Sequence, residues 1–182
     1  MSAKKSARSL AVTGLMTSII SIMSPISVPL PGMVPVSLAT LALYLCTYLL
    51  GTKRTLICYC VYLALGCVGI PIFSGFTGGF SRLLGPTGGY FAGYFAIIIF
   101  EGTALKYFPN SKALHIFGMI LGTAVCYMFG TIWLCFIQRI DFVSGIFAGV
   151  LPFIPSDAVK IAAVSAIAPV MRCRLEKAGL LD

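Results

Sequence analysis

Long stretches without any charged residue are the feature that most constrains how this chain can fold. Charged side chains are absent from residues 9–52, 55–81, 83–100 and 113–138. A helix needs about 20 mostly apolar residues to cross a bilayer, and the first stretch is long enough for two such helices. Only 10% of the residues are charged, against roughly 25% in a typical soluble domain. The sequence therefore predicts an integral membrane protein.

Prolines, glycines and short basic groups divide these stretches into six predicted helices. We place the helices at residues 6–24, 36–50, 55–69, 86–106, 113–137 and 155–172. Pro71 ends the third helix, and Pro86 suits the first turn of the fourth, where its missing N–H is not needed. Residues 144–151 are too few to cross and are expected to form a short or re-entrant helix. The prediction is one all-α domain, residues 1–182, with six transmembrane helices.

The basic residues predict which ends of these helices face the cytoplasm. Ten of the thirteen lie in the N-terminal segment, the 51–54 turn, the 106–112 link or the C-terminal segment. Six crossings place these four segments on one side, so the positive-inside rule predicts that both termini are cytoplasmic. Five or seven crossings would leave one basic terminus on the wrong side. The basic start leads into a full-length apolar helix, so we expect a multi-pass protein of the cell membrane and not a cleaved signal.

The same distribution argues against several other classes of protein. The net charge of +8 is scattered between apolar stretches, whereas nucleic-acid binding needs a contiguous basic face. The seven cysteines form no C-x-x-C pair, and in apolar stretches cysteine acts as a small hydrophobic residue, so no metal site is expected. Phosphate-loop, zinc-protease and nucleophile-elbow motifs are absent from the sequence. We therefore predict no enzymatic activity and no cofactor, and any ATP hydrolysis must occur on another chain.

Three ionisable residues are predicted to meet at the outer end of the bundle. Arg82 lies in a glycine-dense segment before the fourth helix, and Asp157 and Lys160 lie in the first turns of the last helix. Charge within a membrane is costly and by default marks a binding site, although Asp157 could instead pair locally with Lys160 for structural reasons. Thr87 and Tyr90 are further binding candidates near Arg82. Such a site suits a small, largely apolar ligand that is polar at two ends and anionic at one.

A proline-rich loop separates the first two predicted helices. Four prolines fall within residues 25–35, which excludes a helix there. The loop is apolar and uncharged, with Val28, Pro29, Leu30 and Pro31 at its centre. It is expected either to cover an apolar ligand as a lid or to dip into the membrane interface.

Small residues recur along one face of the first predicted helix. Ala7, Ala11, Gly14 and Ser18 are spaced 4, 3 and 4 residues apart, so they share a face that another backbone can approach closely. This face is expected either to pack within the bundle or to dock a partner membrane subunit, and the spacing alone favours neither.

Three motifs, in this order, carry a resemblance to a known family. They are Val-Pro-Val-Ser-Leu at residues 34–38, Gly-Pro-Thr-Gly-Gly-Tyr at residues 85–90, and Pro-Phe-Ile-Pro-Ser-Asp-Ala-Val-Lys at residues 152–160. Together they resemble the BioY family, the biotin-specific substrate-binding (S) components of energy-coupling factor (ECF) transporters. The similarity covers nearly the whole chain. One departure is Ala39, where family members commonly have glutamine, so a polar contact expected there is missing.

The resemblance implies a six-helix protein that captures biotin at the extracellular face. It also implies association with a transmembrane coupling subunit and two cytoplasmic ATPase subunits, and a tilt in the lipid membrane that releases the cargo. For the first helix, it favours the docking interpretation of the face that contains Ala7 and Ala11.

Biotin matches the ligand expected from the residues, because it has a polar ureido ring, an apolar sulfur ring and a carboxylate. Asp157 could accept a hydrogen bond from a ureido N–H, Lys160 could donate to the ureido carbonyl, and Arg82 could face the carboxylate. The reverse arrangement, with Lys160 on the carboxylate, uses the same groups. The alternative function is a stand-alone channel or secondary transporter for a small carboxylate-bearing vitamin.

Overall fold

The part of the chain that the structure describes, residues 2–28 and 34–180, is almost entirely helical. The structure is a computed structural model. Its elements in chain order are α1 (Ser2–Met23), β1 (Ser27–Val28), β2 (Val36–Ser37), α2 (Ala39–Cys67), α3 (Phe80–Leu84), α4 (Gly88–Tyr107), α5 (Lys112–Gln138), α6 (Phe142–Gly149) and α7 (Phe153–Lys177). The two strands pair in an antiparallel ribbon, with Val28 opposite Val36. The prediction of a helical protein is confirmed for these residues, and the ribbon is an addition to it.

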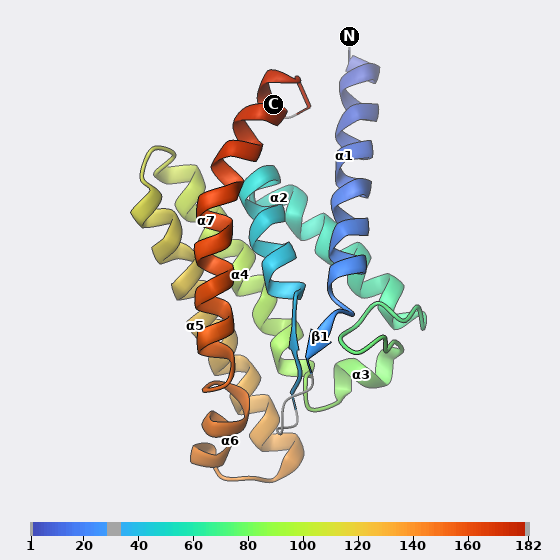
Figure 1. Ribbon diagram of the computed structural model, residues 1–182. Helices are drawn as coiled ribbons and strands as arrows, with labels where there is room; N and C mark the ends of the chain where they lie inside the picture. The colour runs from blue at the N-terminus through green and yellow to red at the C-terminus, as the bar shows by residue number, and fades with distance from the viewer. Residues whose placement is uncertain (1, 29–33, 181–182) are drawn as a thin grey trace.

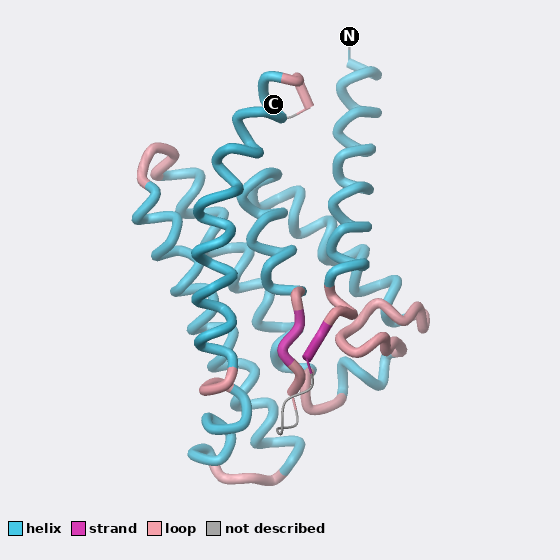
Figure 2. The backbone as a smooth tube through the Cα atoms, viewed as in Figure 1, coloured by secondary structure: helices cyan, strands magenta, loops and turns pink. Residues whose placement is uncertain are grey.

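The long helices run between two ends of the molecule (Figure 1). Both termini, the bend of α2 and the connection between α4 and α5 lie at one end, and the β1–β2 ribbon, α3 and α6 lie at the other. Figure 2 shows that the strands and the longest loops gather at this second end. Among the described helices, α4, α5 and α7 are long and apolar enough to cross a membrane.

The second and third predicted helices are joined more tightly than expected. The only residue in α2 with non-helical backbone angles is Gly51, at φ 74° and ψ 175°. Glycine adopts this conformation easily, whereas a side chain would strain it. The predicted 51–54 turn is therefore wrong in extent, because a single glycine reverses the chain and the helix resumes at once. The result is a hairpin of two helical arms, residues 39–50 and 52–67 (Figure 1).

Three predicted helix starts are corrected by the structure. Residues 36 and 37 belong to β2 and not to a helix, because they pair with β1. Helix α4 starts at Gly88, two residues after Pro86, and the glycine-dense segment before it contains the short helix α3. Helix α7 starts at Phe153, so Pro155 lies in its first turn, where an N–H would have no intrahelical partner. It extends to Lys177, and basic residues in its last turn suit the negative end of the helix dipole.

Close packing of α4 against α5 depends on glycines that face the opposite backbone. A Cβ atom at Gly93 would lie 2.7 Å from the Cα of Cys126, and one at Gly122 would lie 2.7 Å from the Cα of Ile97. These helices therefore approach each other more closely than larger residues would allow. One buried apolar cluster joins α2, α4, α5 and α7, and a second joins α1 to α2 and α4. Together they fix the helix ends around the cavity described next.

Candidate ligand-binding site

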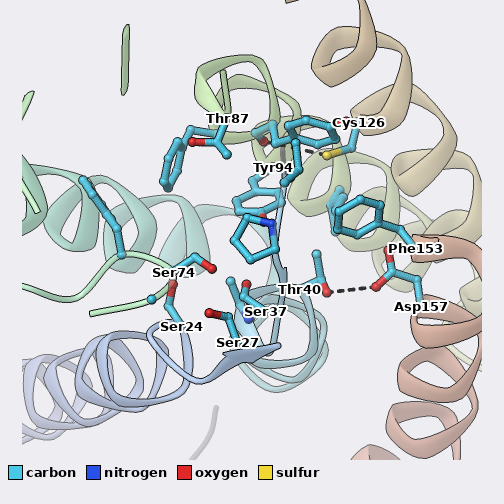
Figure 3. Close-up of a pocket in the computed structure, with 18 of the residues that line it drawn as sticks. Ser24, Ser27, Ser37, Thr40, Ser74, Thr87, Tyr94, Cys126, Phe153 and Asp157 are labelled. Carbon is cyan, nitrogen blue, oxygen red and sulfur yellow. Dashed lines mark hydrogen bonds between the residues drawn. The ribbon is translucent and has the colours of Figure 1, made fainter. Parts of the chain in front are cut away.

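A cavity of about 420 Å³ lies among α2, α3, α4, α5 and α7, beside the β1–β2 ribbon. All five binding residues expected from the sequence line it: Arg82, Thr87, Tyr90, Asp157 and Lys160. Most of the remaining wall is aromatic and aliphatic, and hydroxyl groups from several segments interrupt it (Figure 3). A mostly apolar cavity with a few convergent polar groups is typical of a small-molecule site.

Lys160 is buried in the cavity wall with all three of its N–H groups engaged. Its Nζ atom donates to the backbone oxygen of Ser37 at 2.8 Å, to Oγ1 of Thr40 at 2.9 Å and to Oδ1 of Asp157 at 2.8 Å. The residue is only 5% exposed. A lysine has no further donors. Any ligand acceptor must therefore replace one of these three partners or share a hydrogen atom with it.

Asp157, which is 4% exposed, joins the same network from the other side. Its Oδ1 atom also accepts from Thr40 at 3.2 Å, as Figure 3 shows, and its Oδ2 atom accepts from the Tyr127 hydroxyl at 2.7 Å. We call Thr40, Tyr127, Asp157 and Lys160 the polar cluster. Buried charges are tolerated when they are paired and hydrogen-bonded. The cluster satisfies that condition and links α7 to α2, α5 and the ribbon, so the Asp157–Lys160 pair is more than a local contact within one helix.

Arg82 differs from the buried pair in its surroundings. It lies on α3, is exposed to solvent and lines the cavity. Within the described residues it forms no hydrogen bond through its side chain and no ion pair. The guanidinium can therefore donate hydrogen bonds to an anionic ligand group at the cavity edge without breaking an existing contact.

Thr87 and Tyr90, the two candidate binding residues at the start of α4, play different roles in the cavity wall. Tyr90 is buried, and its hydroxyl donates to the backbone oxygen of Gly149 at 2.7 Å, so its polar end fixes α6 and its ring faces the cavity. Thr87 precedes the first turn of α4, and its side chain makes no capping bond there. The Trp133 indole N–H donates to the backbone oxygen of Gly85 at 2.9 Å. That bond anchors the turn that presents Thr87 to the cavity.

Comparison with known proteins places the chain in a family. The model of the BioY family matches residues 1–177. The chain belongs to the BioY family. It is accordingly a multi-pass membrane protein, and α4, α5 and α7 are the described helices that most clearly have the length and composition to cross the bilayer.

Several BioY relatives are similar over most of their length. "Biotin transporter BioY2" of Lactococcus lactis subsp. cremoris is 32% identical, over 84% of this chain and 83% of the relative. "Probable biotin transporter BioY" of Pyrococcus horikoshii is 34% identical, over 89% of this chain and 94% of the relative. A solved structure, the S-component for biotin from an ECF-type ABC transporter, superposes with a TM-score of 0.87 at 26% identity and covers 94% of each chain. These relatives are named as transporters and transporter components, not as enzymes.

Sequence reasoning missed several polar residues of this BioY cavity, four of which bear most directly on the site. Thr40 and Tyr127 complete the polar cluster, and Ser37 contributes a backbone oxygen to it. The Ser74 hydroxyl is buried without a hydrogen-bond partner among the described residues, and it lines the cavity. Figure 3 places Ser74 beside Ser24 near the ribbon. Thr40 could have been found two residues after the Val-Pro-Val-Ser-Leu motif, but a tyrosine in a charge-free helix gives no comparable signal.

The predicted lid of this BioY chain is only partly visible. Pro29, Leu30 and Pro31 lie outside the described residues. Val28 belongs to β1, is exposed and does not line the cavity, whereas Val34 and Pro35 on the returning side do. The ribbon therefore borders the cavity, and the lid function remains a prediction.

The small-residue face of α1 is uncovered in the part of the chain that the structure describes. Ala7, Ala11 and Gly14 are all exposed. A Cβ atom added at Gly14 would meet no heavy atom within 4 Å. Packing within the described part of the bundle therefore does not explain this face.

Proposed function

We propose that this chain is the biotin-binding S component of an ECF-type vitamin transporter. The observation that carries the proposal is the combination of a buried Asp157–Lys160 pair and an unpaired, exposed Arg82 on one cavity of about 420 Å³. Relatives similar to this chain over most of their length are named biotin transporters, which supports biotin as the ligand. Hydrolysis of ATP would take place on separate subunits.

The burial of the polar groups favours one orientation of biotin. A carboxylate is costly to desolvate, whereas a neutral ureido ring can be buried if its hydrogen bonds are made. The carboxylate would therefore face Arg82 at the exposed edge, and the ureido ring would lie against Asp157 and Lys160. Reversing the ligand would bring its carboxylate toward the Asp157 carboxylate, where two like charges repel each other.

The existing hydrogen bonds indicate how the ureido ring could be accepted. Oδ2 of Asp157 has one donor, Tyr127, and can accept a second hydrogen bond from a ureido N–H. Lys160 must break one of its three hydrogen bonds to donate to the ureido carbonyl. The bond to the backbone oxygen of Ser37 is the one we expect to break, because Ser37 is not part of the polar cluster. Ligand binding would then alter the position of β2, which pairs with β1 at the start of the proposed lid, residues 28–31.

The topology that we propose has six crossings and both termini in the cytoplasm. The crossings are α1, the two arms of α2, and α4, α5 and α7. The basic residues of the termini, of the second arm of α2 and of the α4–α5 connection then share the cytoplasmic end. The cavity and ribbon lie at the opposite end, so biotin would enter from outside the cell.

The proposed partners are a transmembrane coupling subunit and two cytoplasmic ATPase subunits. The similar solved structure is an S-component of an ECF-type ABC transporter, which supports partners of this kind. The exposed face of Ala7, Ala11 and Gly14 is the surface we assign to the coupling subunit, because small residues let a second helix approach closely.

Calorimetric titration of the purified chain with biotin, in lipid nanodiscs and without other subunits, tests the proposed function. The expected result is tight binding of one biotin per chain. Absence of biotin binding, with binding of another vitamin, would overturn the assignment of the ligand. Biotin uptake by proteoliposomes that contain this chain alone would instead support a stand-alone transporter.

A further inference from the structure

A second cavity, a groove of about 490 Å³, lies between α5 and α7. Its walls are mostly aliphatic, with Ile116 and Ile120 on α5 and Ile154 on α7. The other side chains in the lining include Thr123, Tyr127, Asp157 and Ser165. Ala158 and Ala162 on α7 are small, and their exposed positions leave the space between the two helices open. The groove thus opens on the outer surface of a multi-pass membrane protein.

The groove is continuous with surface that faces the bilayer. Phe117 and Leu121 on α5 and Val159 on α7 are large, exposed and apolar, and both helices are apolar enough to cross a membrane. The medium in contact with such a surface is lipid hydrocarbon. The lining contains few polar atoms, so a headgroup or a polar solute would find little to bind there.

The dimensions of the groove distinguish an acyl chain from a protein helix. Residues 116–127 of α5 extend for roughly 16 Å at 1.5 Å per residue, close to half of the roughly 30 Å hydrocarbon core. With a volume of about 490 Å³ spread over that length, the groove is narrow and admits an extended hydrocarbon chain more readily than a helix about 10 Å wide. We propose that the groove is a binding site for one acyl chain of a membrane lipid.

The acyl-chain site shares a wall with the first cavity. Thr123, Tyr127 and Asp157 line both spaces. Two members of the polar cluster, Tyr127 and Asp157, thus lie in the wall between the two spaces, with the Tyr127 hydroxyl bonded to Asp157. An acyl chain in the groove supports Tyr127 and keeps water away from the buried charges. If the proposed function holds, biotin affinity therefore depends on lipid in this groove.

Photolabelling of the chain in proteoliposomes tests the site without any use of biotin. The probe is a phosphatidylcholine with a diazirine on its acyl chain, and labelled residues are identified by mass spectrometry. The expected result is strong labelling of the groove residues of α5 and α7, which is lost in Ala162→Phe because the new ring fills the groove. Ala166→Phe is the matched control, since Ala166 is exposed on the same helix but does not line the groove.

The outcomes separate the acyl-chain site from the proposed function. Equal groove labelling in wild type and Ala162→Phe, or equal loss in Ala162→Phe and Ala166→Phe, would overturn the site. Cross-links from the groove to a second protein chain would overturn it as well. Ala158→Leu, which fills the groove with a smaller side chain, provides a second test if Ala162→Phe does not fold. If biotin binds, removal of lipid is expected to weaken its binding to wild type and Ala166→Phe, but not to Ala162→Phe.

Discussion

At the scale of single residues, the polar cluster explains how an aspartate and a lysine persist inside a membrane protein. Each charge is paired with the other and with uncharged donors or acceptors from other elements. Removal of one member leaves the others buried and incompletely bonded, which is costly. The cluster therefore stabilises the fold and also offers polar groups to a ligand, and a substitution must be tested for both effects.

Asp157→Asn is expected to weaken biotin binding by about 1.5–3 kcal/mol, or about ten- to hundredfold, because a charged acceptor is lost. Calorimetry measures the affinity, and thermal unfolding without biotin measures the stability. Glu176→Gln is the matched control, since Glu176 pairs with Arg172 on the exposed end of α7, outside the cavity. Unchanged affinity with a lower unfolding temperature would show that the Asp157–Lys160 pair is only structural.

Glu101 on α4 shows the opposite situation to the polar cluster. It is 0% exposed, and neither carboxyl oxygen has a hydrogen-bond partner among the described residues. Burial of an unsatisfied polar group costs about 1–3 kcal/mol, so Glu101→Met is expected to raise the free energy of unfolding by about that amount. Thermal unfolding in one detergent compares it with Glu101→Gln, which stays polar and should gain less. A lower unfolding temperature for Glu101→Met would contradict this interpretation.

At the scale of elements, the sequence predicted the long helices well because uncharged stretches and prolines mark them directly. It did not predict that Gly51 alone would turn the chain, since the adjacent Lys53 and Arg54 suggested a solvated loop. It also missed the β1–β2 ribbon, because two-residue strands depend on pairing across the loop and not on a local pattern. Composition thus located the elements, and tertiary contacts determined their ends.

A substitution on the exposed face of α1 tests whether that face docks the coupling subunit. Gly14→Leu is expected to leave biotin binding unchanged, because nothing within the described residues contacts a Cβ atom at this position. The larger side chain should prevent close approach of the coupling subunit, so co-purification of the complex should be lost. Ala166→Leu, also exposed but on α7, should assemble normally. Normal assembly of Gly14→Leu would exclude this face as the docking surface.

At the scale of the whole molecule, the fold gathers residues that are far apart in the chain. Arg82, Asp157 and Lys160 could be assigned to one end from the sequence, because charge distribution and crossing number fix which ends lie together. Thr40 and Tyr127 could not, since hydroxyl groups in apolar helices are common and only the packing of α2 and α5 against α7 brings them to Asp157. The site is thus a product of the bundle, and each helix supplies an incomplete part of it.

The position of biotin in an experimental structure of the complex would test the central claim most directly. We predict the ureido ring beside Asp157 and Lys160, and the carboxylate beside Arg82 at the edge of the same cavity. Biotin bound elsewhere, or inside the cavity with its carboxylate against the buried pair and Arg82 turned away, would contradict the account.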